Sequence, residues 1–106
     1  MSTLSTHVLD STYGVPAVGM RVTVSDADGT DLATTTTDVD GRVRFDLDLD
    51  LGLYLIGFET GVWFAEHERD TFFPAVALTF EVDTSDDHFH VALLLSPYSY
   101  TTYRGS

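Results

Sequence analysis

Short stretches in which polar and apolar residues alternate, divided by turn residues, constrain this chain more than any other feature. Residues 20–26 alternate between valines on one face and polar side chains on the other, the pattern of a strand buried on one side. Asp28-Gly29 and Asp40-Gly41 are pairs that favour tight turns between antiparallel strands. Because turns recur about every 8–12 residues, the pattern favours two packed sheets over any helical fold.

The same pattern predicts the fold class. We expect an all-β fold, a two-sheet antiparallel β-sandwich of about eight strands, with one short helix over residues 61–69. With 106 residues, 43% of them apolar, the chain has room for one core, so residues 1–106 are predicted to form a single domain. Residues 88–95 are expected to form an apolar edge strand. Strands are predicted over residues 4–10, 20–26, 32–37, 43–47, 54–58, 76–82, 88–95 and 98–103.

The charge balance is the most unusual bulk property, with 17 acidic residues against 5 basic ones and a formal net charge of −12. A surface of this sign repels nucleic acid and anionic membranes, so we expect neither as a partner. All the basic residues are arginine, and aspartate outnumbers glutamate. This composition resembles that of halophilic proteins, which tolerate self-repulsion because the Debye length falls to about 3 Å at 1 M salt.

Absences in the sequence restrict the compartment and the chemistry. No apolar run approaches the roughly 18 residues of a membrane span, and residues 1–9 lack the features of a signal peptide, so a soluble cytoplasmic protein is expected. Cysteine is absent, which excludes disulfides, thiolate zinc sites and a cysteine nucleophile. The Gly-x-Ser-x-Gly elbow, phosphate-binding glycine loops and His-Glu-x-x-His helices are also missing.

Three histidines and one arginine stand out from the strand pattern. His88 and His90, two residues apart on one predicted strand, project from the same face about 6.5–7 Å apart. Such a pair binds a metal, shares acid–base work, or lies at the surface of an acidic loop, and His-x-His alone is a weak metal signal. By pattern alone, His7 is interpreted as a strand histidine with a local hydrogen bond, and Arg42 as a solvated arginine after a turn. We predict neither a metal nor a cofactor.

Two long motifs resemble those of one family. Residues 7–17, HVLDSTYGVPA, are similar to the opening motif of transthyretin and its relatives, and residues 88–106, HFHVALLLSPYSYTTYRGS, are similar to the closing motif. Residues 37–42 and 72–74 fall between them in the expected order. The resemblance covers essentially the whole chain and implies a transthyretin-like sandwich.

The family contains carriers of thyroid hormone and hydrolases of 5-hydroxyisourate, and this chain resembles the hydrolases. It has His7, Arg42, His90 and the terminal tetrapeptide Tyr103-Arg104-Gly105-Ser106. In the carriers a lysine replaces the first histidine, the second is lost and the tail is unrelated. The resemblance implies hydrolysis of a cyclic amide in 5-hydroxyisourate to 2-oxo-4-hydroxy-4-carboxy-5-ureidoimidazoline, a step of urate (purine) catabolism that uses no cofactor.

The resemblance also implies roles for these residues. His7 and His90 activate water and relay its proton, in an order that the sequence leaves open. Arg42 keeps a neighbouring imidazole neutral and donates hydrogen bonds to the carbonyl oxygens of the substrate. Ser106 supplies a hydroxyl and the terminal carboxylate. The predicted substrate-binding residues are Arg42, Tyr103 and Arg104.

The family further implies a homotetramer, a dimer of dimers with its sites between the dimers. Ala92, Ser99 and Thr101 depart from the residues usual in the hydrolases, and the first two are carrier-like. They keep a non-catalytic carrier of small ligands open as the main competing hypothesis. A metal-binding module built on His88 and His90 and a plain structural domain are two weaker hypotheses. In the hydrolase, His88 would be a supporting or surface residue.

Overall fold

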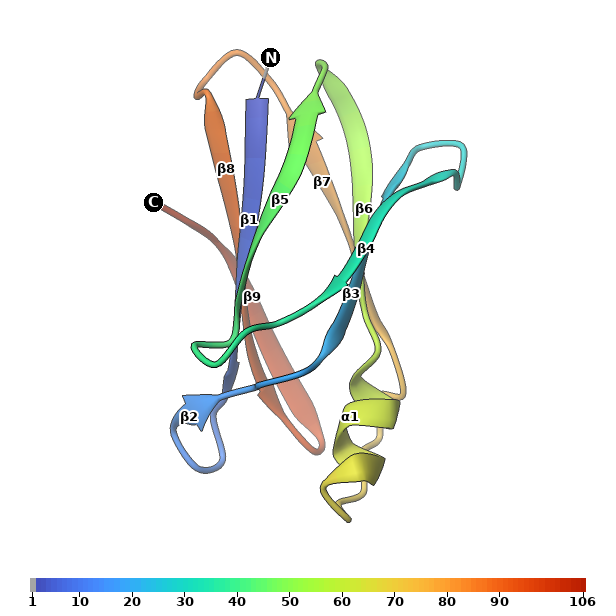
Figure 1. Ribbon diagram of the computed structural model, residues 1–106, viewed down its shortest axis with the longest axis vertical. Coiled ribbons are helices and arrows are strands. Elements are labelled where there is room, and N and C mark those ends of the chain that lie inside the picture. Colours follow the sequence, from blue (N-terminus) through green and yellow to red (C-terminus); the bar gives the residue numbers. More distant parts are fainter. Residues whose placement is uncertain (1) are drawn as a thin grey trace.

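The computed structural model describes residues 2–106, which form two β-sheets packed face to face with one short helix at one end (Figure 1). The strands are β1 (Ser2–Asp10), β2 (Val15–Pro16), β3 (Arg21–Asp26), β4 (Asp31–Thr36), β5 (Arg42–Leu49), β6 (Gly52–Phe58), β7 (Val76–Val82), β8 (His88–Ser96) and β9 (Ser99–Gly105). The helix is α1 (Thr60–Glu66). The predicted all-β two-sheet sandwich is confirmed, and the strand that the sequence did not predict is the two-residue β2.

The strand order places β1 near the middle of the first sheet. That sheet runs β2-β1-β8-β9, and β5 also pairs with β1; the second sheet runs β4-β3-β6-β7. The pairing of β1 with β8 is parallel, from Thr3 opposite His88 to Asp10 opposite Leu95, whereas the other pairs are antiparallel. The expectation that residues 88–95 form an edge strand is therefore wrong. A nearly continuous apolar run is typical of a strand inside a sheet, because neighbouring strands occupy both of its sides.

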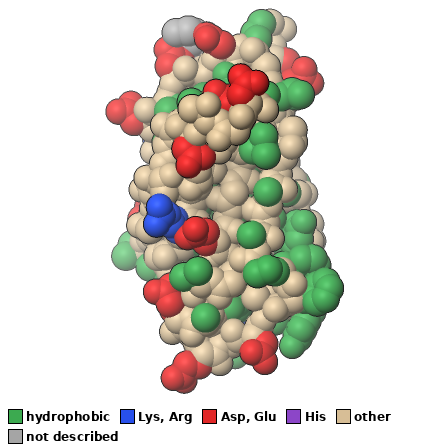
Figure 2. All heavy atoms as spheres, turned by 90° about the vertical axis from the view of Figure 1, so that its right-hand side faces the viewer, with side chains coloured by type: hydrophobic (Ala, Val, Ile, Leu, Met, Phe, Trp, Pro, Cys, Tyr) green, Lys and Arg blue, Asp and Glu red, His purple; other side chains and the backbone are tan. Residues whose placement is uncertain are grey.

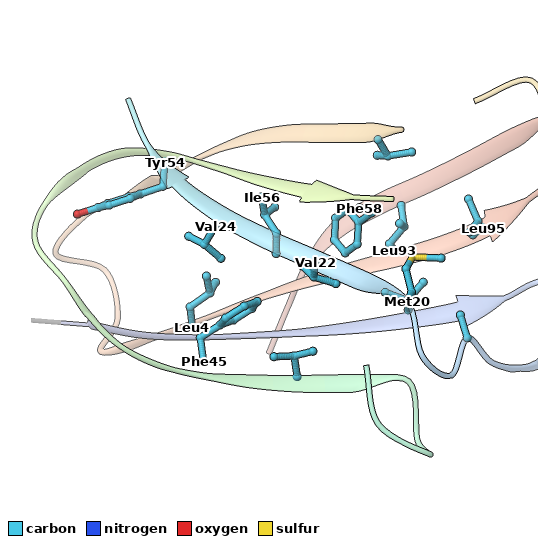
Figure 3. Close-up of a cluster of buried hydrophobic side chains, with 14 of the residues drawn as sticks. Leu4, Met20, Val22, Val24, Phe45, Tyr54, Ile56, Phe58, Leu93 and Leu95 are labelled. Carbon is cyan, nitrogen blue, oxygen red and sulfur yellow. The ribbon is translucent and has the colours of Figure 1, made fainter. Parts of the chain in front are cut away.

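Alternation along β1 separates the core from the outer face of the first sheet. Leu4 and Val8 are fully buried and pack into the core between the two sheets, together with apolar side chains from both (Figure 3). Thr6 is also buried, and its hydroxyl donates to the carbonyl oxygen of Val91 at 2.6 Å. Successive side chains of a strand point to opposite faces, so Ser5 and the other odd-numbered residues of β1 face away from the core.

The helix is shorter than predicted, because α1 ends at Glu66 rather than near residue 69. Glu68 adopts a left-handed backbone conformation, with φ of 56°, which takes the chain out of the helix. The turn brings Arg69 to Asp10 on β1, and their side chains form an ion pair at 2.7 Å. Trp63 ties the helix to the loop before β3, because its Nε1 donates to the carbonyl oxygen of Val18 at 2.8 Å.

Acidic side chains are spread over one side of the molecule rather than gathered in one patch there. Figure 2 shows them scattered across the side of the molecule that lies at the right of Figure 1. Within residues 2–106, no helix is long and apolar enough to cross a membrane.

Candidate functional site

A row of side chains across the outer face of the first sheet contains two of the predicted catalytic residues. His7 on β1 lies opposite Arg42 on β5 and, on its other side, opposite Ala92 on β8. Ala92 in turn lies opposite Tyr103 on β9. Because partners in a sheet share a face, the row runs from Arg42 through His7 to Tyr103.

The neighbouring row contains the third predicted catalytic residue. Ser5 on β1 lies opposite Arg44 on β5 and His90 on β8. His90 then lies opposite Gly105 on β9. His90 and His7 are therefore placed diagonally across the junction of β1 and β8.

A pocket of about 380 Å³ opens beside these rows. The residues that line it and bear on the chemistry are Ser5, Arg42, Arg44, His88, His90 and Ser106. The structure thus brings Arg42, His90 and the terminal Ser106 around one pocket. His7 lies beside this group, opposite Arg42 in the sheet.

The turn before β5 fixes the position of Arg42. Oδ1 of Asp38 accepts hydrogen bonds from the backbone N–H of Asp40 at 2.9 Å and of Arg42 at 3.0 Å. These bonds, first the one from Arg42, hold the pKa of the Asp38 carboxyl below its ordinary value. Gly41 has φ of 73°, and a Cβ there would collide with the carbonyl oxygen of Val8. Glycine therefore lets the turn lie directly against β1 and sets Arg42 opposite His7.

The imidazole of His90 is held on both of its flanks. Its Nδ1 lies 2.7 Å from Oγ of Ser5, and a Cβ added at Gly105 would collide with its Cδ2. Nδ1 and Cδ2 are the ring atoms bonded to Cγ, so the opposite edge of the ring, with Cε1 and Nε2, lies farthest from the backbone of β8, and His90 lines the pocket. Glycine at position 105 is what leaves room for this ring.

The surroundings of His90 favour its neutral form. Burial is the largest cause that lowers the pKa of His90 below its ordinary value of 6.5, followed by the positive charge of Arg42 and then by His7 and His88. A histidine of this kind keeps a free lone pair to more acidic pH than an exposed one. That is the property that a general base needs near neutral pH.

His88 belongs to the same face and is held by two hydroxyl groups. Its Nδ1 lies 2.6 Å from Oγ1 of Thr3, and its Nε2 lies 2.8 Å from Oγ of Ser5. Both ring nitrogens are engaged in this way, which does not favour the metal-binding hypothesis. In the part of the chain that the structure describes, no three His, Cys, Asp or Glu residues gather as a metal site would require.

Alternation along β9 places Tyr103 and Arg104, which are predicted to bind substrate together with Arg42, on opposite faces of the sheet. Tyr103 is exposed on the outer face, in the row of His7. Arg104 points to the other face, where its guanidinium carbon lies 4.6 Å from the centre of the Phe89 ring and its Nη2 donates to Oγ of Ser85 at 3.2 Å. There it lines a second hollow, between β7 and β9. His90 and Tyr103 line that second hollow too, whereas Arg104 is absent from the pocket lined by Arg42 and Ser106. The substrate-binding role of Arg104 stays a prediction.

Ser5 and Arg44 are pocket residues that the sequence did not single out. Each lies two residues from a predicted catalytic residue, Ser5 from His7 and Arg44 from Arg42, so alternation was the signal that could have placed them on the same face. Alternation could not show that Ser5 contacts His90, which is 85 residues further along the chain. Only the parallel pairing of β1 with β8 makes that contact.

Known proteins are similar to this one in sequence and in the arrangement of their strands. Residues 4–105 match the model of the HIUase/Transthyretin family. The chain belongs to this family. The family model thus covers both cross-strand rows, with only the terminal Ser106 of the pocket outside it.

The proteins similar to this chain include 5-hydroxyisourate hydrolases and a transthyretin. A 5-hydroxyisourate hydrolase of Caulobacter vibrioides is 44% identical, in an alignment that covers 100% of this chain and 100% of that protein. The structure of Klebsiella pneumoniae 5-hydroxyisourate hydrolase is 42% identical with a TM-score of 0.92, and covers 100% of this chain and 94% of that one. Sea bream transthyretin in complex with thyroxine is 31% identical with a TM-score of 0.87, and covers 96% and 93%. Because the fold is common to both functions, function must be argued from the site.

Proposed function

We propose that the protein is a 5-hydroxyisourate hydrolase and that His90 is the base of the reaction. The observation that carries this proposal is the His90 imidazole, whose lowered pKa favours the neutral form and whose Nε2 edge faces a pocket lined by Arg42 and Ser106. Relatives named 5-hydroxyisourate hydrolase, 41% and 44% identical over nearly the whole chain, support the substrate. The product is 2-oxo-4-hydroxy-4-carboxy-5-ureidoimidazoline, in urate catabolism. The proposed unit is a single domain of residues 1–106.

The chemistry follows from the atoms around the pocket. Nε2 of His90 takes a proton from water as the water oxygen bonds to the carbonyl carbon of the cyclic amide. The C–N bond of the ring then breaks, and the departing nitrogen takes the proton from His90, which becomes neutral again. Arg42 donates from its planar fork of N–H groups to the oxygen on which negative charge develops.

The other residues near the pocket support this step. We assign His7, beside Arg42, to relaying the proton, and Ser106 to contacting the substrate through its hydroxyl. Tyr103, in the same row, offers a face on which a planar heterocycle can stack. Hydrolysis turns the amide carbonyl into a carboxylate, and Arg44 adds a second positive charge to the pocket where that carboxylate forms.

The test of the function is a direct assay. 5-Hydroxyisourate is generated in situ with urate oxidase in high-salt buffer, and its ultraviolet absorbance is followed with and without the untagged protein. We expect decay faster than the spontaneous rate. Decay at the spontaneous rate in the presence of folded protein would favour the carrier hypothesis, which the carrier-like Ala92 and Ser99 support. Equilibrium binding of thyroxine would then be measured.

Replacing Arg42 by glutamine is expected to raise the pH at which activity is lost in acid. In the unsubstituted protein the acid limb of kcat/KM lies below pH 6.5, because burial first and Arg42 second lower the pKa of His90. Without the charge of Arg42, protonation of His90 becomes easier, so the acid limb of the profile moves toward pH 6.5. The move is partial, because burial still lowers the pKa of His90. The pH profile of kcat/KM, which reports the base of the free enzyme, measures this.

The matched control for that measurement is Arg21→Gln. Arg21 lies on the second sheet and its nearest acidic partner is Glu59, at 3.8 Å, so its loss should leave the acid limb in place. An acid limb at the same pH in the protein with and without Arg42 would contradict the role given to this arginine.

We also propose that the protein is halophilic, cytoplasmic and a homotetramer, a dimer of dimers. The net charge of −12 supports a salt requirement. Exposed aromatic side chains, Phe72 at 72% and Tyr98 at 70%, support burial against other copies. The cytoplasmic location is checked by fractionating the source cells, and recovery with the membrane or the medium would contradict it.

Lowering the salt concentration is expected to weaken both the fold and the assembly. At 0.1 M salt the Debye length is about 10 Å, against about 3 Å at 1 M, so the acidic groups repel one another over longer distances. Circular dichroism melts and sedimentation velocity at both salt concentrations measure the two effects. Equal melting temperatures would reject the halophilic proposal, and a monomer at high salt would reject the tetramer.

A further inference from the structure

A chain of hydrogen bonds runs along the outer face from His90 to the start of β8. Oγ of Ser5 lies 2.7 Å from Nδ1 of His90 and 2.8 Å from Nε2 of His88. Nδ1 of His88 lies 2.6 Å from Oγ1 of Thr3, whose hydroxyl reaches the carbonyl oxygen of Asp87 at 3.5 Å. Among these described side chains, Nε2 of His90 is the one ring nitrogen left free to meet a ligand in the pocket.

The carbonyl oxygen of Asp87, at the end of this chain of hydrogen bonds, favours one direction of donation along it. The Thr3 hydroxyl has one proton, and the carbonyl oxygen of Asp87, 3.5 Å away, can only accept it. When the hydroxyl donates there, it accepts from Nδ1 of His88. Nε2 of His88 then accepts from the Ser5 hydroxyl, which in turn accepts from Nδ1 of His90. In this direction Nδ1 of His90 carries the proton and Nε2 presents a lone pair.

The charges at the two ends favour the same direction. Arg42, Arg44 and Asp38 line the pocket beside His90, and the Oδ1 of Asp38 already accepts two backbone N–H groups. An N–H at Nε2 of His90 would point a positive dipole toward the two arginines, whereas a lone pair points a negative one. The acidic residues Asp86 and Asp87 lie at the other end, where the hydroxyl and N–H groups of the chain point. The hydrogen bonds and the charges therefore agree.

We propose that Ser5, with His88 and Thr3 behind it, is a positioning residue that fixes His90 in the tautomer with the proton on Nδ1 and the lone pair of Nε2 in the pocket. This inference rests on the proposed hydrolase for its consequence, since the free lone pair is what accepts the proton of water. The second histidine of His88-Phe89-His90 thus acts on substrate, and the first acts through Ser5.

The test is the tautomer of His90, measured in the whole protein by ¹⁵N NMR of the imidazole nitrogens at about pH 8, where histidine is neutral. We expect a protonated Nδ1 and an unprotonated Nε2. In Ser5→Ala, Nδ1 loses its acceptor, so the population moves toward the tautomer protonated on Nε2. We expect kcat to fall about tenfold to a hundredfold with KM little changed, the scale seen when a partner that orients a metal-bound histidine is removed.

Two further variants separate this role from a general loss of structure. Ser5→Thr keeps the hydroxyl and should restore both the tautomer and most of kcat. Ser25→Ala is the matched control, because Ser25 is also a strand serine, with a bond of 2.9 Å to Asp31 on the second sheet, and should change neither.

Separate results would overturn the inference and the proposed function. A His90 protonated on Nε2 in the unsubstituted protein, or a Ser5→Ala variant with an unchanged tautomer and an unchanged kcat, would overturn the inference. Lack of any hydrolysis by the unsubstituted protein would overturn the proposed function. The tautomer measured in that same protein would still decide whether the hydrogen bonds run from His90 toward Asp87.

Discussion

Replacing His90 by asparagine is expected to lower kcat for 5-hydroxyisourate by at least about a hundredfold, the lower end of what a general base contributes. Asparagine keeps polar atoms in the gap between Ser5 and Gly105 but has no lone pair basic enough to take a proton from water. The fold should survive, because His90 lies on the outer face and leaves the core untouched. The coupled urate oxidase assay measures the loss.

His67→Asn provides the matched control for this substitution. His67 is an exposed histidine just after α1, where its ring stacks on Trp63 with the centroids 4.2 Å apart, away from Ser5 and Gly105. Its replacement should leave kcat unchanged. Near-normal turnover in His90→Asn, from protein that melts like the unsubstituted one, would reject His90 as the base.

Extending the chain beyond Ser106 is expected to damage activity while the fold stays intact. Ser106 lines the pocket, and residues added after it would fill the space beside Arg42 and His90. We expect kcat/KM to fall at least about tenfold, the equivalent of one lost hydrogen bond to a charged group. The same assay on tagged and untagged protein measures the effect, and circular dichroism checks the fold.

The control for the extension carries the same residues inserted in the turn after Asp28, between β3 and β4. That turn is exposed and belongs to the second sheet, so the insertion should leave activity unchanged. Full activity of the C-terminally extended protein would remove Ser106 from the mechanism.

Local sequence was enough to predict most of the strands, since a strand with one buried face must alternate and a tight turn needs particular residues. Residues 76–82, for example, are predicted and observed as one strand, β7. The end of α1 was different, because the chain leaves the helix through the left-handed Glu68 and brings Arg69 to Asp10 on a distant strand, a contact that local sequence does not show. Residues 88–95 were mistaken for an edge because an apolar run does not say which strands lie beside it.

By itself, the sequence determined the two-sheet fold, the family, and which residues of a strand share a face, because all three depend on local alternation and on motifs that are continuous in the chain. Only the tertiary structure decided which faces meet. The parallel pairing of β1 with β8 put Ser5 between His88 and His90, and the register of β9 set Arg104 opposite Val91 and against the ring of Phe89. Strand pairing joins residues that are far apart in sequence, and a shift of one residue would reverse every face, so these contacts are set by the packing of the whole sandwich.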